Sequence, residues 1–100
     1  MKSIMELTRE APRIKAKYPP GTRIQLSHMN DSYSPVPDGT RGTVKYVDDI
    51  GQIFMNWDNG RTLPLNVHED SFRKLTDEEL EQELEQTTEE TGMNMGGITQ

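Results

Sequence analysis

The run QIFMNWDNGRTLPL, residues 52–65, holds the clearest structural signal in the chain. Asn59-Gly60 stands between two runs of strand-forming residues. A type I′ hairpin requires positive φ angles at both central turn residues, and Asn and Gly tolerate them best. The sequence therefore predicts a β-hairpin with strands at 52–57 and 62–65. The second strand is expected at a sheet edge because Pro64 has no N–H group to donate.

The segments on either side of this hairpin also have strand patterns. Ile24 and Leu26 alternate with polar residues, as in a half-buried strand. Gly42 indicates a bulge or bend in the following strand, which helps a small sheet to close. The predicted strands are 22–27, 39–47, 52–57, 62–65 and 72–75, with a proline-containing loop at 29–38. Five short strands in this arrangement predict a mainly β fold, a small five-stranded barrel over residues 18–75.

A short helix is predicted before the barrel. Ser3 and Glu6 have the spacing of a capping box, in which each side chain bonds the other residue's backbone N–H. Pro19-Pro20-Gly21 ends the helical pattern after about Lys17. Residues 1–17 are therefore expected to form an N-terminal helical segment.

A second, acidic helix is predicted after the barrel. Thr76 and Glu79 form another capping box, and the helix is expected to run to about Glu90. Leu80 and Leu84 are its only apolar contact face, which is narrow. Residues 91–100 are expected to be disordered, so 76–100 forms an acidic helix and tail.

The composition predicts one domain in a reducing compartment. One hundred residues leave no room for a second core, and the hydrophobic share of 31% predicts that part of the chain, the C-terminal tail above all, is unfolded. No cysteine is present, which excludes disulfides and thiolate chemistry. No apolar run approaches ~18 residues and the N-terminus lacks an apolar signal core. These features predict a soluble, cytoplasmic protein.

Charge is distributed unevenly along the chain. Residues 1–20 carry five bases and two acids, residues 21–75 six bases and seven acids, and residues 76–100 eight acids and no base. The net charge of -6 therefore resides mainly in the C-terminal segment. The overall charge therefore gives no support for nucleic-acid binding, but a local basic patch is still possible.

The sequence lacks the patterns of an enzyme or a metal protein. His28 and His68 have no set of further ligands at zinc-site spacing, and no Ser, His and acid arrangement is recognisable. Asp48-Asp49 fits a solvated turn better than a catalytic pair. We therefore expect no catalytic residue, no metal and no cofactor.

Three groups of residues are candidates for binding. The simpler interpretation is that they belong to the core or to the solvated exterior of the barrel. The aromatic candidates could anchor a protein partner, the basic ones could form a stripe that contacts phosphates, and the acidic ones could enter a cationic groove. Arg73 and Lys74 could extend the basic stripe. The candidates are Tyr33, Tyr46 and Trp57; Arg23, Arg41, Lys45 and Arg61; and Asp77, Glu78, Glu81 and Glu85.

The strand residues also resemble a known family. Tyr18-Pro19-Pro20-Gly21-Thr22-Arg23, Asp38-Gly39-Thr40 with Gly42 and Val44, Val47-Asp48-Asp49 with Gly51, and Trp57-Asp58-Asn59-Gly60 are similar to a family of small bacterial domains of unknown function. The resemblance covers residues 18–75. It implies an SH3-like barrel and an origin in plasmids, prophages or conjugative elements, but no catalytic residue.

That setting and the acidic segment suggest inhibition of host defence by binding. The leading hypothesis is a type II anti-CRISPR protein that blocks Cas9 or its assembly with guide RNA, with the acidic helix in a groove meant for nucleic acid. One alternative is direct RNA or DNA binding by the basic residues. Another is an adaptor that grips an extended peptide across exposed aromatics. Fold alone does not choose among them, and the oligomeric state is left open.

Overall fold

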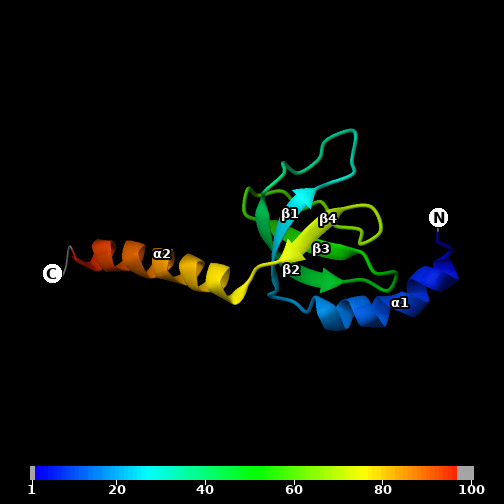
Figure 1. Cartoon of the computed structure of the whole chain (residues 1–100), viewed down its shortest axis with the longest axis horizontal. Helices are drawn as coiled ribbons and strands as arrows, with labels where there is room; N and C mark the ends of the chain where they lie inside the picture. The colour runs from blue at the N-terminus through cyan, green and yellow to red at the C-terminus, as the bar shows by residue number, and fades with distance from the viewer. Residues whose placement is uncertain (1, 97–100) are drawn as a thin grey trace.

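The computed structural model describes the backbone of residues 2–96 and the side chains of residues 2–86. A β-sheet lies between a helix at each end of the chain, and the C-terminal helix projects away from it (Figure 1). The elements are α1 (Ile4–Lys17), β1 (Arg23–His28), β2 (Arg41–Val47), β3 (Ile53–Trp57), β4 (Ser71–Lys74) and α2 (Asp77–Gly96).

The four strands form one antiparallel sheet in the order β3-β2-β1-β4. Alternation along the strands sends one set of side chains inward, including Ile24, Val44 and Met55. The pairing shifts between Val44 and Tyr46, so the bulge in β2 lies at Lys45. The sequence predicts a bulge or bend at Gly42, three residues earlier. β3 and β4 are the edge strands.

The predicted fifth strand, 62–65, is reduced to a single bridge between Ile53 and Leu65. Pro64 has no N–H for a ladder, and the carbonyl oxygen of Leu63 accepts a hydrogen bond from the Trp57 indole at 2.8 Å. The backbone therefore leaves the sheet here. The sheet is not closed, and the fold is a four-stranded antiparallel sheet with two helices.

The hairpin turn also differs from the predicted type I′. Gly60 has a φ of 90°, whereas Asn59 does not have a positive φ. Instead the Asn59 side chain accepts a hydrogen bond from the N–H of Arg61 at 3.0 Å. Asn-Gly makes the turn, but by a side-chain bond at Asn59 and a left-handed conformation only at Gly60.

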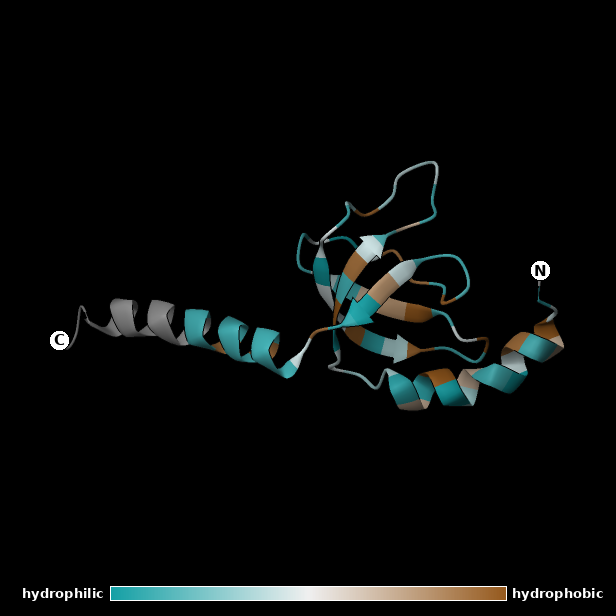
Figure 2. Cartoon of the chain, in the orientation of Figure 1, coloured by the Kyte–Doolittle hydropathy of each residue, from teal (hydrophilic) through white to brown (hydrophobic). Residues whose placement is uncertain are grey.

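The core lies on the inner face of the sheet and beside α1 (Figure 2). Ala11 and Ile14 are buried on α1, and the Ile14 Cδ1 atom lies 2.8 Å from the place where a Cβ on Gly51 would stand. Helix α1 thus packs over the turn between β2 and β3. The buried core residues are Ile14, Tyr18, Ile24, Leu26, Met29, Val36, Val44, Val47, Ile53, Met55, Trp57 and Leu65.

Both predicted capping boxes are confirmed. Ser3 and Glu6 exchange hydrogen bonds of 3.0 and 3.2 Å at the start of α1, and Thr76 and Glu79 exchange bonds of 2.9 and 3.1 Å before α2. Helix α1 ends at Lys17, as predicted. Helix α2 continues past Glu90, the predicted end, to Gly96. Residues 97–100, the end of the segment predicted to be disordered, lie outside the described part.

Neither helix of the described part of the chain combines the length and apolar character needed to cross a lipid bilayer.

Candidate binding site

Three arginines from three strands lie on the outer face of the sheet. Arg41 on β2 and Arg73 on β4 are both register partners of Gln25 on β1, so they flank it. Arg23 lies two residues before Gln25, on the same face. We call Arg23, Arg41 and Arg73 the arginine cluster. Such a cluster of like charges requires anions nearby.

Helix α2 supplies those anions from its first two turns. Glu79 binds Arg73 through two hydrogen bonds of 2.7 and 2.8 Å and reaches Arg41 at 3.5 Å. Glu83 accepts from the Nε and Nη2 atoms of Arg23 at 3.0 and 2.6 Å and from Arg41 at 3.2 Å. Residues four apart share one face of a helix, so both carboxylates point at the sheet.

A third carboxylate completes the arrangement from the β3 hairpin. Asp58 accepts two hydrogen bonds from the guanidinium of Arg23, both at 2.8 Å. Arg23 therefore joins the hairpin to α2, while Thr43 accepts a further bond from it at 3.1 Å. Paired N–H···O bonds of this kind fix geometry as well as charge.

The pairing shifts the ionisation of the partners. The hydrogen bonds from Arg73, and then the backbone N–H of Thr76, lower the pKa of Glu79 to about 2. Arg23 lowers the pKa of Asp58 and of Glu83 by hydrogen bonding, although partial burial opposes it. The pKa of Arg23 is raised by the bonds to Asp58 and Glu83. All these groups are charged at neutral pH, so α2 is held by ionic hydrogen bonds.

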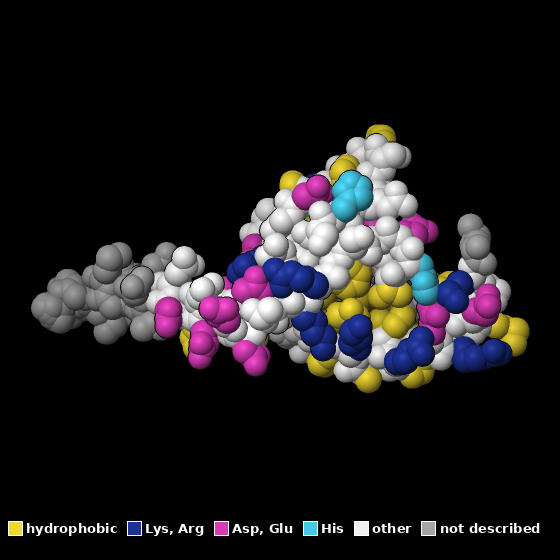
Figure 3. Space-filling view, viewed as in Figure 1, with side chains coloured by type: hydrophobic (Ala, Val, Ile, Leu, Met, Phe, Trp, Pro, Cys, Tyr) yellow, Lys and Arg dark blue, Asp and Glu magenta, His cyan; other side chains and the backbone are white. Residues whose placement is uncertain are grey.

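The acidic candidates lie on the other side of α2. At about 100° per residue, Asp77, Glu81 and Glu85 follow one another opposite Glu79 and Glu83, with Glu78 beside them. All four are exposed. Figure 3 shows the acidic side chains along the projecting helix. We call Asp77, Glu78, Glu81 and Glu85 the outer acidic face.

The basic candidates separate into three environments. Arg23 and Arg41 join the arginine cluster, and Lys45 is exposed on β2. Arg61 instead donates to the carbonyl oxygens of Ser34 at 2.5 Å and Pro35 at 3.4 Å, so it holds the 29–38 loop. The four bases therefore do not form one stripe.

The aromatic candidates do not form one surface either. Tyr33 is 96% exposed on the 29–38 loop, and Tyr46 is 48% exposed and stacks on Phe54 with ring centroids 4.8 Å apart. Trp57 is only 3% exposed and lies in the core. This corrects the placement of Trp57 on a binding face, because its position in β3 points inward, as Ile53 and Met55 do.

Arg73, Glu79 and Glu83 are the functional candidates that the sequence analysis did not select. The sequence predicts Glu79 only as a capping residue and Arg73 only as an extension of the basic stripe. The signal that could have linked them is the spacing of two glutamates four residues apart, right after a strand that ends in Arg73-Lys74.

The histidines each contact one acid. His28 Nδ1 lies 3.2 Å from Asp38, and His68 Nε2 contacts Glu10. Within the part of the chain that the structure describes, no group of three or more metal-binding side chains gathers.

Comparison with known proteins places the sheet in a family. Residues 8–75 match the domain of unknown function DUF4314. The chain belongs to this family. The DUF4314 domain takes in all four strands and α1 from Thr8 onward, so it begins earlier than the 18–75 expected from the resemblance. It ends at Leu75, just before α2. No curated protein and no solved structure matches the chain.

Proposed function

We propose that this protein is a non-enzymatic binding protein whose helix α2 presents the outer acidic face to a basic surface of a protein partner. The observation that carries the proposal is that α2 has two acidic faces with different surroundings. Glu79 and Glu83 bind the arginine cluster, while Asp77, Glu81 and Glu85 point away from it. In this proposal the DUF4314 domain is a scaffold that holds the acidic helix α2 in a fixed direction.

The chemistry of such a helix suits a surface that binds nucleic acid. Carboxylates repeated along a helix compete for the same Lys and Arg side chains that bind phosphates. Because α2 is held against the sheet, it loses less conformational entropy when it binds a partner than a flexible acidic tail would. The charge of residues 76–100, eight acids without a base, adds long-range attraction.

Cas9, or Cas9 with its guide RNA, is the partner class that we put first. Its nucleic-acid channel is positively charged, and the leading hypothesis from the sequence is a type II anti-CRISPR protein of a mobile genetic element. The same proposal treats the open sheet and the bridged 62–65 segment as a variant of the SH3-like barrel.

The test compares two triple variants with the same change in net charge. The variant Glu78→Gln, Glu81→Gln, Glu85→Gln removes three charges from the outer acidic face. The control Asp38→Asn, Asp49→Asn, Glu69→Gln removes three exposed carboxylates from the DUF4314 domain. Cas9 cleavage is measured with each protein added before and after guide RNA.

We expect inhibition by the wild type and the control, strongest when protein is added first, and a loss of about tenfold or more in the α2 variant. Equal inhibition by both variants would remove the outer acidic face from the mechanism. Absence of inhibition and of co-elution with Cas9 would reject this partner, and a set of other basic nucleic-acid-binding proteins would be screened in the same way.

A second function is favoured by the arginine cluster itself. Three guanidinium groups on one sheet face would offer several cations to the phosphates of a flexible single strand, and Lys45 lies on the same strand as Arg41. In this alternative α2 covers a nucleic-acid site and must leave it for RNA or DNA to bind.

A further inference from the structure

A groove lies between α1 and β4, away from α2 (Figure 1). Its volume is about 550 Å³, and Ile14, Tyr18, Val67 and Phe72 supply its apolar floor. The Tyr18 and Phe72 rings pack 5.6 Å apart. Figure 3 shows the hydrophobic floor in a hollow above the basic side chains of α1. An apolar recess of this size fits one or two side chains of a partner.

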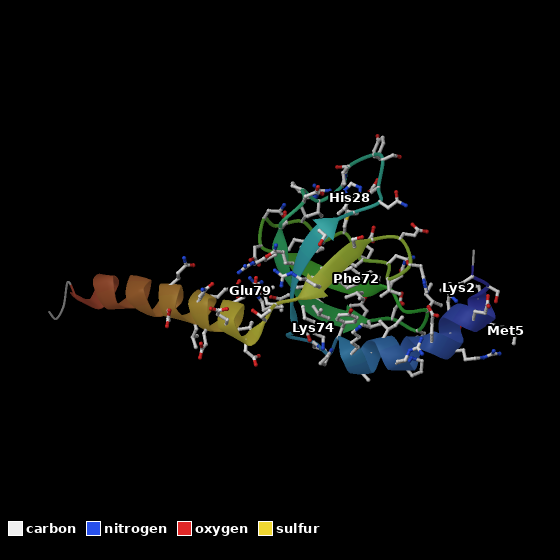
Figure 4. All side chains as sticks on the ribbon, viewed as in Figure 1. Lys2, Met5, His28, Phe72, Lys74 and Glu79 are labelled. Atoms are coloured by element: carbon white, nitrogen blue, oxygen red, sulfur yellow. The ribbon has the colours of Figure 1, made fainter. Side chains whose placement is uncertain are left out.

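The strand beside the groove has an unpaired edge. Among the described strands β4 pairs with β1 alone, and the N–H of Leu75 donates to the carbonyl oxygen of Arg23 at 3.1 Å. Backbone groups alternate sides along an antiparallel strand, so those of Arg73 also face β1, whereas those of Phe72 and Lys74 face away. Figure 4 labels both residues on β4. The carbonyl oxygen of Lys74 already accepts a hydrogen bond from Arg73 Nη1 at 3.1 Å. The edge therefore offers the N–H and C=O groups of Phe72 and the N–H of Lys74 to another extended chain.

The rim of the groove is basic. Arg13 and Lys17 line it from α1, and the Nζ atoms of Lys17 and Lys74 each lie 5.5 Å from the centre of the Tyr18 ring. Among the described residues, neither Arg13 nor Lys17 has a carboxylate within ion-pair distance.

The two acids that line the groove are already engaged. Glu10 contacts His68 and Lys2, and hydrogen bonding from His68 lowers the pKa of Glu10. Asp70 accepts hydrogen bonds from the N–H groups of Asn30 and Asn66, both at 2.8 Å. Three cations, Arg13, Lys17 and Lys74, thus face two acids, of which Glu10 is also paired with Lys2, so the net charge at the groove is positive.

We propose that this groove binds an extended, acidic peptide segment of a protein partner, added as a strand beside β4. Its backbone pairs with the N–H and C=O groups of Phe72 and with the N–H of Lys74. One apolar side chain enters the recess over Tyr18, and its carboxylates meet Arg13, Lys17 and Lys74. Strand addition supplies affinity through the main chain, and the recess and the rim supply selectivity. This site is separate from α2 and does not depend on the function proposed above.

The experiment uses the full chain and a blocked eight-residue peptide in which glutamate alternates with valine around one central phenylalanine. Amide exchange is followed residue by residue by NMR. We expect the Phe72 and Lys74 amides to exchange at least about tenfold more slowly in the presence of saturating peptide. The same peptide with lysine in place of glutamate should leave both rates unchanged.

A matched pair of single variants on α1 tests the rim. Lys17→Glu reverses a charge on the groove, and Arg9→Glu reverses an exposed charge outside its lining. Peptide affinity should fall about fivefold or more in the first variant and less than about twofold in the second.

Three results would overturn the proposal. The first is no binding of the glutamate peptide at millimolar concentration. The second is binding that leaves Phe72 and Lys74 exchange unchanged, since it would then not be strand addition. The third is a dimer in light scattering with these two amides already protected, because a second copy would then occupy the edge. None of these results bears on the outer acidic face, so the two proposals fail independently.

Discussion

At the scale of single residues, Gly42 marks the tightest contact in the sheet. A Cβ atom there would lie 2.8 Å from Cε3 of Trp57 and 3.0 Å from the carbonyl oxygen of Asn56. Trp57 is fixed by its indole bond to Leu63, and Asn56 is backbone of the neighbouring strand. Neither neighbour can withdraw, so only glycine fits here.

The variant Gly42→Ala should be less stable by about 1–3 kcal/mol, because added volume in a packed core forces side chains and backbone to shift. Urea unfolding, followed by Trp57 fluorescence, measures the effect. Lys45→Ala on the same strand is exposed and should change stability by less than about 0.5 kcal/mol. An unchanged midpoint for Gly42→Ala would mean that β2 and β3 are further apart than the structure has them.

The pKa of Glu79 predicts how the docking of α2 depends on pH. Its ordinary pKa is 4.5 and its folded pKa is about 2, so the docked state favours the ionised form. The contribution of Glu79 to docking is complete above about pH 4.5 and is lost as the pH falls towards 2. The carboxyl carbon shift of Glu79 in NMR should report this titration directly.

In Arg73→Ala the largest cause of the shift is removed, and the Glu79 pKa should rise towards its ordinary value. Lys74→Ala, next in sequence but without a bond to Glu79, should leave the pKa low. A Glu79 pKa near 4.5 in the wild-type protein would contradict the bidentate pair with Arg73.

At the scale of elements, α2 is joined to the sheet by charge more than by apolar contact. Leu80 and Leu84 are 40% and 67% exposed. None of the α2 side chains that the structure describes, residues 77–86, belongs to the core cluster. Since exposed and half-exposed ion pairs are weak individually, the docking depends on several of them acting together.

The variant Glu79→Gln, Glu83→Gln should release α2 and expose the arginine cluster. If that cluster can bind phosphates, fluorescence anisotropy with single-stranded RNA should show binding by this variant that weakens steeply with salt, and little binding by wild type. Glu81→Gln, Glu85→Gln has the same net charge and should behave as wild type. If the released variant also fails to bind RNA at low salt, the nucleic-acid alternative should be dropped.

The elements show how far the sequence is informative. Both helix starts are predictable because Ser3 with Glu6 and Thr76 with Glu79 are local signals. The alternation around Ile24 and Met55 likewise predicts the strands. The loss of the 62–65 strand depends on a bond between Trp57 and Leu63, and the docking of α2 depends on arginines 6 to 60 residues away in sequence. Contacts of this range leave no periodic pattern.

At the scale of the whole molecule, the charges are segregated in space as well as in sequence. Helix α2, with its acidic side chains, extends to one side of the sheet, and α1, with most of the basic side chains of the N-terminal segment, extends to the other (Figure 1 and Figure 3). Such a molecule has a large electric dipole and orients in the field of a charged partner before contact. The segregation was predictable from residue counts, but the direction in which α2 points was not.

The short connection before α2 has a thermodynamic consequence. Only Leu75 and Thr76 separate β4 from the helix, so the carboxylates of Glu79 and Glu83 face the arginines as a tethered ligand. For short links the effective concentration of such a ligand is of the order of millimolar or higher. A free anion must outcompete this local supply to reach the arginines, whereas a partner that binds the outer acidic face need displace nothing. The short connection therefore weakens the binding of free anions to the arginine cluster but does not weaken the binding of a partner to the outer acidic face.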